Sequence, residues 1–295
     1  MGPVTAAMRF AKYHGAGNDF VLVEDLQDEL RLSPSLIALL CDRHRGVGAD
    51  GLIRIAADDE ADFFMDYYNA DGEAAEMCGN GIRCLAKHVY DRGLTSAVQV
   101  DVKTRAGIKR LAIDASEGVA HRVTVDMGMP ALDRKAIPMT GEPADRFIGQ
   151  PLEVDGAWYT ATALSMGNPH CVLFVPDPKD LDGIDLARLG PAVEHRAEFP
   201  HRTNVEFVQA RDGRIRTRVW ERGSGETMAC GTGACAALVA SALAGLTGRE
   251  ADVDFPGGTL HVAWDEDDHV SLTGPAVLVF EGELEAAWVR EASGP

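Results

Sequence analysis

Two cysteines of the chain, Cys78 and Cys230, stand in the same short pattern, Cys-Gly-x-Gly, within the strings MCGNGIRC and ACGTGACA. A strand-like segment precedes each cysteine and a helical segment follows it, so each should lie at a helix N-terminus. The unpaired N–H groups and the positive dipole end at that position favour a thiolate and can bind a carboxylate. Glycines beside the cysteine leave room for a ligand and permit positive φ in the turn.

Together the two cysteines suit proton transfer at the α-carbon of an amino acid. The carbanion formed there is high in energy, so donors must hold the carboxylate as charge moves onto it. Inversion also needs a base on one face of the carbon and an acid on the opposite face. We therefore expect Cys78 and Cys230 to invert an amino-acid stereocentre, one as thiolate and the other as thiol, with no cofactor and no metal.

Other interpretations of the cysteines fit the spacing less well. Free cysteines usually pack as small apolar residues, and either motif alone would be read that way. A zinc site from Cys78, Cys84, Cys230 and Cys235 needs C-x₂₋₄-C spacing, which only the second pair has, and there is no C-x-x-C redox motif. We assign four cysteines to packing: Cys41, Cys84, Cys171 and Cys235.

An internal repeat relates the two motifs. The string HGAGND at His14 to Asp19 is answered by SMGNPH at Ser165 to His170. The two cysteines are 152 residues apart, and Asn18 and Asn168 are 150 apart. Agreement in both order and offset favours duplication, with two similar halves that each present one cysteine.

Short alternating segments predict a β-rich fold with few helices around these motifs. One helix should begin at Ser33-Pro34 and end near His44, and two more follow Gly79 and Gly231. The segment from Gly128 to Pro151 is rich in proline and should be the crossing between the halves. Strands are expected at Met8 to Tyr13, Phe20 to Glu24, Leu52 to Ala57, Phe63 to Asn69, Val98 to Val102, Val119 to Met127, Trp158 to Leu164, Cys171 to Val175, Asn204 to Ala210, Ile215 to Trp220, Thr259 to Trp264 and Val277 to Phe280.

Composition narrows the class of protein. The formal charge of -18 would repel polyanions, which argues against nucleic-acid and anionic-membrane partners. No stretch approaches the roughly 20 apolar residues that cross a bilayer. Because the N-terminus shows no export signal, we expect a cytoplasmic protein whose six cysteines are reduced. The sequence does not fix the oligomeric state, and a homodimer is compatible with it.

Several polar residues lie at turns or strand ends near the motifs. Asn69 and Glu221 each stand nine residues before their cysteine, which gives them the same relation to the two thiols. Arg222 could grip a carboxylate, and His170 could either tune a thiol or complete a turn. Turn capping is the simpler interpretation of the asparagines Asn18, Asn69, Asn168 and Asn204.

At this point the sequence resembles the diaminopimelate epimerase family. The matching strings run in order over nearly the whole chain: KYHGAGNDF, RHRGVGADG, NADG, MCGNGIRC, MGNPHCV, RTNVEFV, WERGSGET and ACGTGAC. The resemblance implies an α/β (α+β) fold of two pseudo-symmetric halves, each a curled, mostly antiparallel sheet around a central helix. The halves would be residues 1–127 with 276–295, and residues 128–275, with the active site in the cleft between them.

The resemblance also implies the reaction, which is the interconversion of LL- and meso-diaminopimelate on the way to lysine and peptidoglycan precursors. Cys78 and Cys230 would be the two bases, and His170 and Glu221 would modulate the thiols. Gly79-Asn80 and Gly231-Thr232 would hold the reacting carboxylate. The rest of the substrate would be held by Asn18, Asn69, Asn168, Asn204, Glu221 and Arg222.

Two departures from the family pattern concern details of the site. Glu73-Ala74 follows NADG where many members have Ser-Glu, and Gly51 stands where some members offer a glutamine. The segment GVGADG, Gly46 to Gly51, satisfies a dinucleotide fingerprint, but it follows a predicted helix and precedes a strand, which is the reverse of that motif's setting.

Alternative functions remain open from the sequence. A related cofactor-independent racemase could act on histidine or proline, although Arg222 with four asparagines favours a substrate that is polar at both ends. An isomerase of the phenazine-biosynthesis type would lack the cysteine pair. A non-catalytic amino-acid-binding protein is disfavoured by the two matched thiols.

Overall fold

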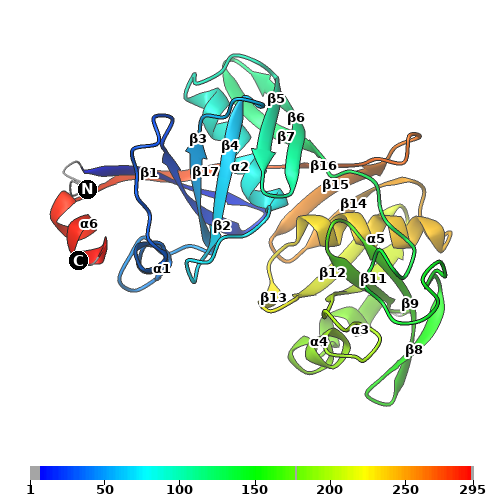
Figure 1. Ribbon diagram of the computed structural model, residues 1–295. Coiled ribbons are helices and arrows are strands. Elements are labelled where there is room, and N and C mark those ends of the chain that lie inside the picture. Colours follow the sequence, from blue (N-terminus) through cyan, green and yellow to red (C-terminus); the bar gives the residue numbers. More distant parts are fainter. Residues whose placement is uncertain (1–6, 177, 294–295) are drawn as a thin grey trace. The chain divides into compact units, whose positions relative to one another are not determined.

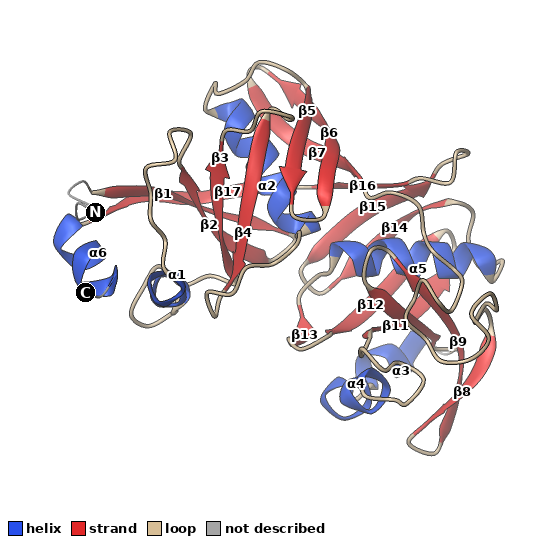
Figure 2. Ribbon diagram, in the orientation of Figure 1, coloured by secondary structure: helices blue, strands red, loops and turns tan. Residues whose placement is uncertain are grey.

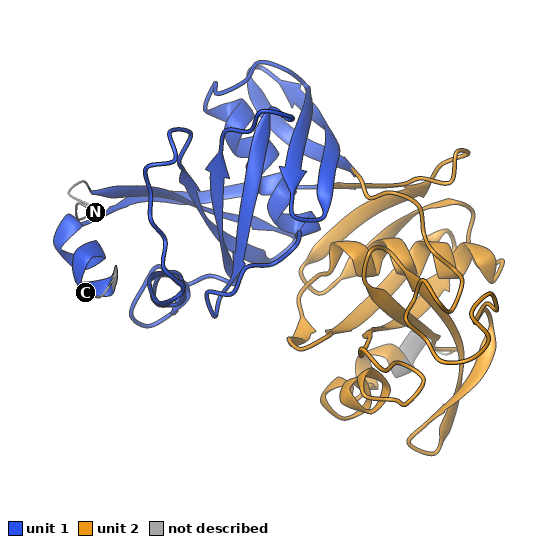
Figure 3. Cartoon of the chain, viewed as in Figure 1, with its two compact units in different colours: residues 1–125, 274–295 blue, residues 126–273 orange. Residues whose placement is uncertain are grey.

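The computed structural model describes residues 7–176 and 178–293. The chain forms two compact units, unit 1 from residues 1–125 with 274–295 and unit 2 from residues 126–273 (Figure 3). These limits lie two residues from those expected from the sequence.

Unit 1 is built on a sheet in which neighbouring strands are mostly antiparallel. In space the order is β17, β1, β2, β3, β4, β5, β6, β7, and the two parallel pairs are β2 with β3 and β4 with β5. The strands are β1 (Met8–Gly15), β2 (Asn18–Glu24), β3 (Gly51–Ala56), β4 (Phe63–Asn69), β5 (Gln99–Thr104), β6 (Gly107–Ser116), β7 (Val119–Asp126) and β17 (Val277–Leu284).

Unit 2 repeats this pairing pattern. Its order is β8, β9, β10, β11, β12, β14, β15, β16, with parallel pairs β10 with β11 and β12 with β14, while the short β13 pairs with β12. The strands are β8 (Gln150–Val154), β9 (Ala157–Ser165), β10 (Pro169–Phe174), β11 (Asn204–Arg211), β12 (Arg214–Glu221), β13 (Gly225–Thr227), β14 (Glu250–Phe255), β15 (Gly258–Trp264) and β16 (Val270–Gly274). The matched succession of parallel and antiparallel pairs confirms the internal repeat.

One buried helix lies inside each curled sheet, α2 (Gly79–Asp91) in unit 1 and α5 (Gly231–Leu243) in unit 2 (Figures 1 and 2). Helix α5 touches six strands of its own unit, from β9 to β15. It can be enclosed on all sides because its sequence, GTGACAALVASAL, is small and apolar around the whole circumference. The curled sheets around central helices confirm the predicted fold class.

Four further helices lie outside the central positions. They are α1 (Pro34–Cys41), α3 (Pro178–Gly183), α4 (Leu186–Glu194) and α6 (Ala286–Ser293). Helix α1 has Ser33 as its N-cap, as predicted, but it ends at Cys41 rather than near His44. The reason is Asp42, whose carboxylate accepts hydrogen bonds from the backbone N–H groups of His44 and Arg45 and so forms a turn.

The predicted strands all occur, with ends that differ by up to four residues. Five strands and three helices were not predicted: β6, β8, β13, β14, β16, α3, α4 and α6. The crossing expected between Gly128 and Pro151 consists of turns and isolated bridges until β8 begins at Gln150. Among the described residues, no helix is both long enough and apolar enough to cross a membrane.

Candidate active site

Both motif cysteines are the N-cap residues of the central helices. Cys78 has φ −136° and ψ 117° before α2, and Cys230 has φ −126° and ψ 120° before α5. These extended conformations turn the chain from the preceding segment into the helix, so the first N–H groups of each helix stay free of intrahelical partners. The structure therefore places each cysteine at a helix N-terminus, as the sequence indicated, and in unit 2 Gly233 N donates to the Cys230 thiol.

The glycines of the motifs serve close packing rather than an unusual backbone conformation. Gly79, Gly81, Gly231 and Gly233 are all helical, which corrects the expectation of positive φ. A Cβ on Gly81 would lie 2.7 Å from the Ile53 side chain. A Cβ on Gly233 would lie 2.9 Å from a Glu206 carboxylate oxygen. The first turn of each helix thus packs directly on β3 or β11.

In unit 1, an asparagine amide oxygen faces the thiol. The Cys78 Sγ donates to Asn18 Oδ1 at 3.7 Å, and Asn80 Nδ2 donates to the same oxygen at 3.3 Å. Asn80 is buried at the start of α2, and its own Oδ1 accepts from the fully buried Arg83. Three of the predicted site residues are therefore brought together.

A network of charges fixes the orientation of Asn18. Its Nδ2 donates to Asp50 Oδ2 at 2.8 Å, which leaves Oδ1 directed at the thiol. Arg43 pairs with both Asp50 and Asp19, and Lys12 pairs with Asp19 at 2.6 Å. Burial alone would raise the pKa of Asp19, but hydrogen bonds from Arg43 and Lys12 hold this pKa well below its usual value.

Asn69 ends β4 and is exposed, directly opposite Gly51 in the pairing of β3 with β4. Gly51 is buried, and a Cβ there would meet Tyr68 O at 2.6 Å and the Tyr67 ring at 2.7 Å. The position that some family members give to glutamine therefore has no room for any side chain here. Glu73, the displaced acidic residue after NADG, is exposed and caps a turn with its backbone.

In unit 2, the thiol of Cys230 is surrounded by donors and by acids. Gly233 N donates to its Sγ at 3.4 Å, and Thr232 Oγ1 lies 3.4 Å from the same sulfur. The thiol also makes a hydrogen bond with Glu221, whose Oε1 accepts from Thr227 at 2.5 Å. Cys230 is 5% exposed, so it is much more enclosed than the half-buried Cys78.

Burial raises the pKa of Cys230 well above its ordinary value, and the nearby Glu221 and Glu206 raise it further. Burial likewise raises the pKa of Glu221, although its bonds to Thr227 and Cys230 oppose this. The sequence led us to expect that the helix N-terminus would favour a thiolate. At Cys230 the cost of desolvation and the two acids outweigh that effect, so the thiol form is favoured.

His170 and Asn168 lie behind this thiol in a hydrogen-bonded series. His170 is fully buried at the start of β10, with Nδ1 2.7 Å from Glu206 Oε1 and Nε2 2.9 Å from Asn168 Oδ1. Asn168 Nδ2 then donates to Thr232 Oγ1 at 3.4 Å. His170 is thus linked to the region of Cys230 through other side chains.

Asn204 and Arg222 are joined at the end of the same sheet. Asn204 is buried, where its Oδ1 accepts from Arg222 N at 2.9 Å and its Nδ2 donates to Pro169 O. The Arg222 guanidinium is exposed, and one of its nitrogens donates to His201 O at 3.3 Å. Asn204 therefore shapes the backbone, while Arg222 has a guanidinium that solvent can reach.

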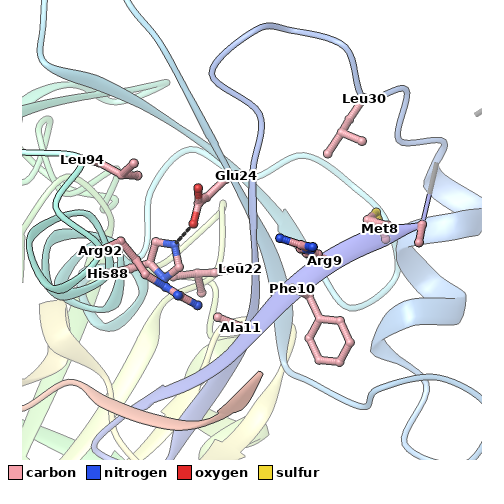
Figure 4. A pocket seen from close by; sticks show the side chains of 11 residues that line it. Met8, Arg9, Phe10, Ala11, Leu22, Glu24, Leu30, His88, Arg92 and Leu94 are labelled. Carbon is pink, nitrogen blue, oxygen red and sulfur yellow. Dashed lines mark hydrogen bonds and ion pairs between the residues drawn. The ribbon is translucent and has the colours of Figure 1, made fainter. Parts of the chain in front are cut away.

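A separate cavity of about 530 Å³ lies in unit 1, beside the C-terminal part of α2 that holds His88. Figure 4 shows the side chains that line it. The cavity is lined by apolar side chains such as Phe10 and by Glu24, His88 and Arg92, and His88 bonds Glu24 at 2.8 Å. His88, which lines this cavity, stands ten residues after Cys78, about 15 Å farther along the helix. The cavity is not part of the site described above.

The sequence analysis did not anticipate the roles of Asp50 and Glu206. Asp50 bonds Asn18 directly, and Glu206 is linked to Asn168 through His170. Glu206 stands in TNVEFV, an acidic residue between apolar strand positions. The strand pairing of the two units shows which positions are equivalent. His170 pairs with Asn204 in unit 2 as Phe20 pairs with Gly51 in unit 1. Two residues farther along, Glu206 therefore occupies the position of Ile53. A polar residue that replaces an apolar one at a repeated core position marks a specialised role.

The sequence of this chain is similar to those of known proteins along nearly its whole length. The sequence model of the family described as diaminopimelate epimerase matches residues 10–132 and 162–279. The diaminopimelate epimerase of Pelotomaculum thermopropionicum is 50% identical over 279 residues, which covers 94% of this chain and 98% of that protein. That of Leptospira biflexa is 46% identical over 280 residues, with 94% and 99% covered.

Solved structures share the fold at low sequence identity. A hydroxyproline epimerase from Agrobacterium vitis superposes with a TM-score of 0.68 at 14% identity, covering 94% of this chain and 91% of that one. A PhzF-family phenazine biosynthesis protein from Bacillus anthracis gives a TM-score of 0.67 at 19% identity, with 95% and 99% covered. From the family model and the full-length relatives, this chain belongs to the diaminopimelate epimerase family.

Proposed function

We propose that this protein interconverts LL- and meso-2,6-diaminopimelate, with Cys78 and Cys230 as acid and base on opposite faces of one α-carbon. The proposal rests on one observation, which is that a cysteine is the N-cap of the central helix in both units. One such site could be a packing feature. Two equivalent sites supply the two opposed groups that inversion requires.

The proton balance of the reaction is simple. The thiolate of one cysteine takes the α-proton, and the thiol of the other delivers its proton to the opposite face. No electrons are exchanged, and the two sulfurs end with their protonation states reversed. The backbone N–H groups at Gly79-Asn80 and Gly231-Thr232 hold the carboxylate, where they stabilise the charge that develops in the transition state.

The remaining site residues hold the substrate and tune the thiols. Asn18, Asn69, Asn168 and Asn204 offer amides, and the exposed guanidinium of Arg222 suits a distal carboxylate. Glu221 bonds the Cys230 thiol and is the group placed to receive its proton when the thiolate is needed. His170 acts on the same thiol through Asn168 and Thr232.

The test is α-proton exchange in deuterated water followed by NMR. Exchange with LL- or meso-diaminopimelate supports the function, and its absence sinks it. Exchange with histidine or proline instead would reassign the substrate. Since both cysteines act on one carbon, mild oxidation should join Cys78 to Cys230 and abolish activity until a reductant is added. Both thiols remaining free in the inactivated enzyme would contradict the shared site.

We also propose that the enzyme works as a homodimer in the cytoplasm, where its thiols stay reduced. Four consecutive apolar residues of β17 are exposed, Val277, Leu278, Val279 and Phe280, at 41%, 39%, 54% and 46%. Because successive side chains of a strand point to opposite faces, β17 exposes apolar groups on both faces, and a second copy of the chain packed on one face would bury part of them. Sedimentation should give a dimer for the natural protein and a monomer for Val279→Glu; an unchanged dimer in the variant would exclude this surface.

A further inference from the structure

Glu206 is a buried carboxyl group that the proposed chemistry does not use directly. It lies in β11 between Val205 and Phe207, and its side chain is fully buried. One oxygen, Oε1, bonds His170 Nδ1 at 2.7 Å. The other, Oε2, is buried without a hydrogen-bond partner among the described residues. A buried acid in this state needs an explanation, because desolvation makes it costly.

The surroundings favour a pair of Glu206 and His170 with no net charge. An ionised Glu206 beside a neutral imidazole would leave a buried negative charge with one bare oxygen. Burial raises the pKa of Glu206, which favours retention of a proton by the pair. Other titratable groups that interact with Glu206 are Cys171, Glu221 and Cys230, none of which supplies a positive charge.

The proton count of this pair decides which way the Asn168 amide points. In the uncharged pair His170 Nε2 carries a proton and donates to Asn168 Oδ1, 2.9 Å away. The amide NH₂ of Asn168 is then directed at Thr232 Oγ1, which lies 3.4 Å from Cys230 Sγ. If Nε2 lost its proton, it would accept from the amide NH₂ instead, and Asn168 would have to turn over.

Unit 1 shows that the fold does not require these polar groups. Phe20 and Ile53 occupy the positions of His170 and Glu206 there, as the strand pairing shows. Both are fully buried, and Ile53 packs under Gly81 as Glu206 packs under Gly233. The pair in unit 2 is therefore an added feature of the Cys230 side.

We propose that Glu206 is a positioning residue, which keeps His170 protonated at Nε2 and thereby holds the Asn168 amide NH₂ toward Thr232 and Cys230. The inference deepens the proposed function and rests on it for its effect on catalysis. The hydrogen-bond chain itself is a property of the protein without substrate, so it can be tested separately.

Two substitutions distinguish the hydrogen bond from the charge and from packing. Glu206→Gln keeps a donor for His170 Nδ1, so Nε2 should stay protonated and activity should be retained. Glu206→Ile copies the apolar residue of unit 1 and leaves Nδ1 with no donor. Gln209→Leu is the matched control, because it removes another buried polar side chain from the same strand.

The first measurement is ¹⁵N–¹H NMR of histidine side chains, with the His170 signal identified by its loss in His170→Asn. The natural protein, Glu206→Gln and Gln209→Leu should show a protonated Nε2 that exchanges slowly with water. Glu206→Ile leaves Nδ1 without a partner, so the proton can sit on either ring nitrogen, and the Nε2 signal should weaken and exchange faster with water. An unchanged signal in folded Glu206→Ile, or no such signal in the natural protein, overturns the proposal.

The second measurement is kcat/KM for diaminopimelate. Glu206→Ile should lower it at least about tenfold, because Asn168 is no longer held in one orientation. Glu206→Gln and Gln209→Leu should remain near the natural value. If Glu206→Ile does not fold, Glu206→Gln decides, since loss of its activity with intact folding contradicts the proposal. If the natural protein has no epimerase activity, the proposed function fails while the NMR result still stands.

Discussion

Cys78 and Cys230 occupy the same place in two copies of one fold, yet the side chains behind them differ in kind. Behind Cys78, Asn18 is turned by the exposed Asp50 and presents its amide oxygen to the thiol. Behind Cys230, Asn168 is turned by the buried His170 and presents its NH₂ toward Thr232. The duplicated backbone places equivalent groups, and the side chains that diverged set the hydrogen-bond polarity at each sulfur.

The largest expected effect is loss of either sulfur. Cys78→Ser and Cys230→Ser should each lower epimerisation at least about a hundredfold, because inversion needs both an acid and a base. NMR of substrate in deuterated water, with circular dichroism to confirm folding, measures this. Either single variant that inverted at the natural rate would show that the two cysteines are not a working pair.

Gly81 and Gly233, in the first turns of the two central helices, offer a further comparison of packing in the two units. Gly233→Ala should destabilise unit 2 by about 1–3 kcal/mol, because the new methyl meets the Glu206 carboxylate and presses on Cys230. Gly81→Ala meets the side-chain ends of Ile53 and Met65 closely and Cys78 Cβ at an ordinary 3.5 Å, and the helix gains about 1 kcal/mol from alanine. Urea unfolding and activity should rank the first variant as more damaged; the opposite ranking would contradict this difference in packing.

Alkylation should separate the two thiols. Iodoacetamide should modify the half-buried Cys78 before Cys230, whose raised pKa keeps it as a thiol until the pH exceeds that pKa. Glu221→Gln removes a nearby negative charge, so alkylation of Cys230 should shift toward lower pH by about one unit. Peptide mapping by mass spectrometry follows each site. An unchanged Cys230 profile in the variant would show that Glu221 does not act on it.

The smallest effect is expected behind Cys78. Asp50→Ala removes the acceptor of Asn18 Nδ2, but Asp50 is 44% exposed and water can take its place. We expect kcat/KM to fall less than about fivefold, clearly less than for the buried Glu206→Ile. Steady-state kinetics of both variants side by side make the comparison. An equal loss of kcat/KM in Asp50→Ala and Glu206→Ile would mean that the burial of Glu206 does not make it more important than Asp50.

Much of the fold could be read from the sequence, because strand alternation and the repeated Cys-Gly-x-Gly strings are local signals. The strands β14 and β16, EADVDF and VSLTG, alternate polar and apolar residues, and they were missed although the local signal was present. Helix α4 holds Pro191 and was missed for that reason.

The sequence could predict which residues meet at the site where those residues belong to the repeated motifs. Asn18, Asn80 and Cys78 come together as the repeat suggested, and so do Asn168, Thr232 and Cys230. The orientation of each amide was not predictable, because it depends on Asp50 and Glu206, which approach from other strands. The pKa of Cys230 was also beyond reach, since burial and neighbouring acids are tertiary properties.

The pairing of β17 with β1 has a consequence for synthesis of the chain. Residues Met8 to His14 pair with Leu284 to Val277, so the sheet of unit 1 contains strands from both ends of the sequence. Unit 2 is continuous, from residue 126 to residue 273, and can pack its core as soon as it leaves the ribosome. Unit 1 must wait with the β1 edge uncovered until β17 emerges. The Cys78 side, although made first, is therefore the last to be completed.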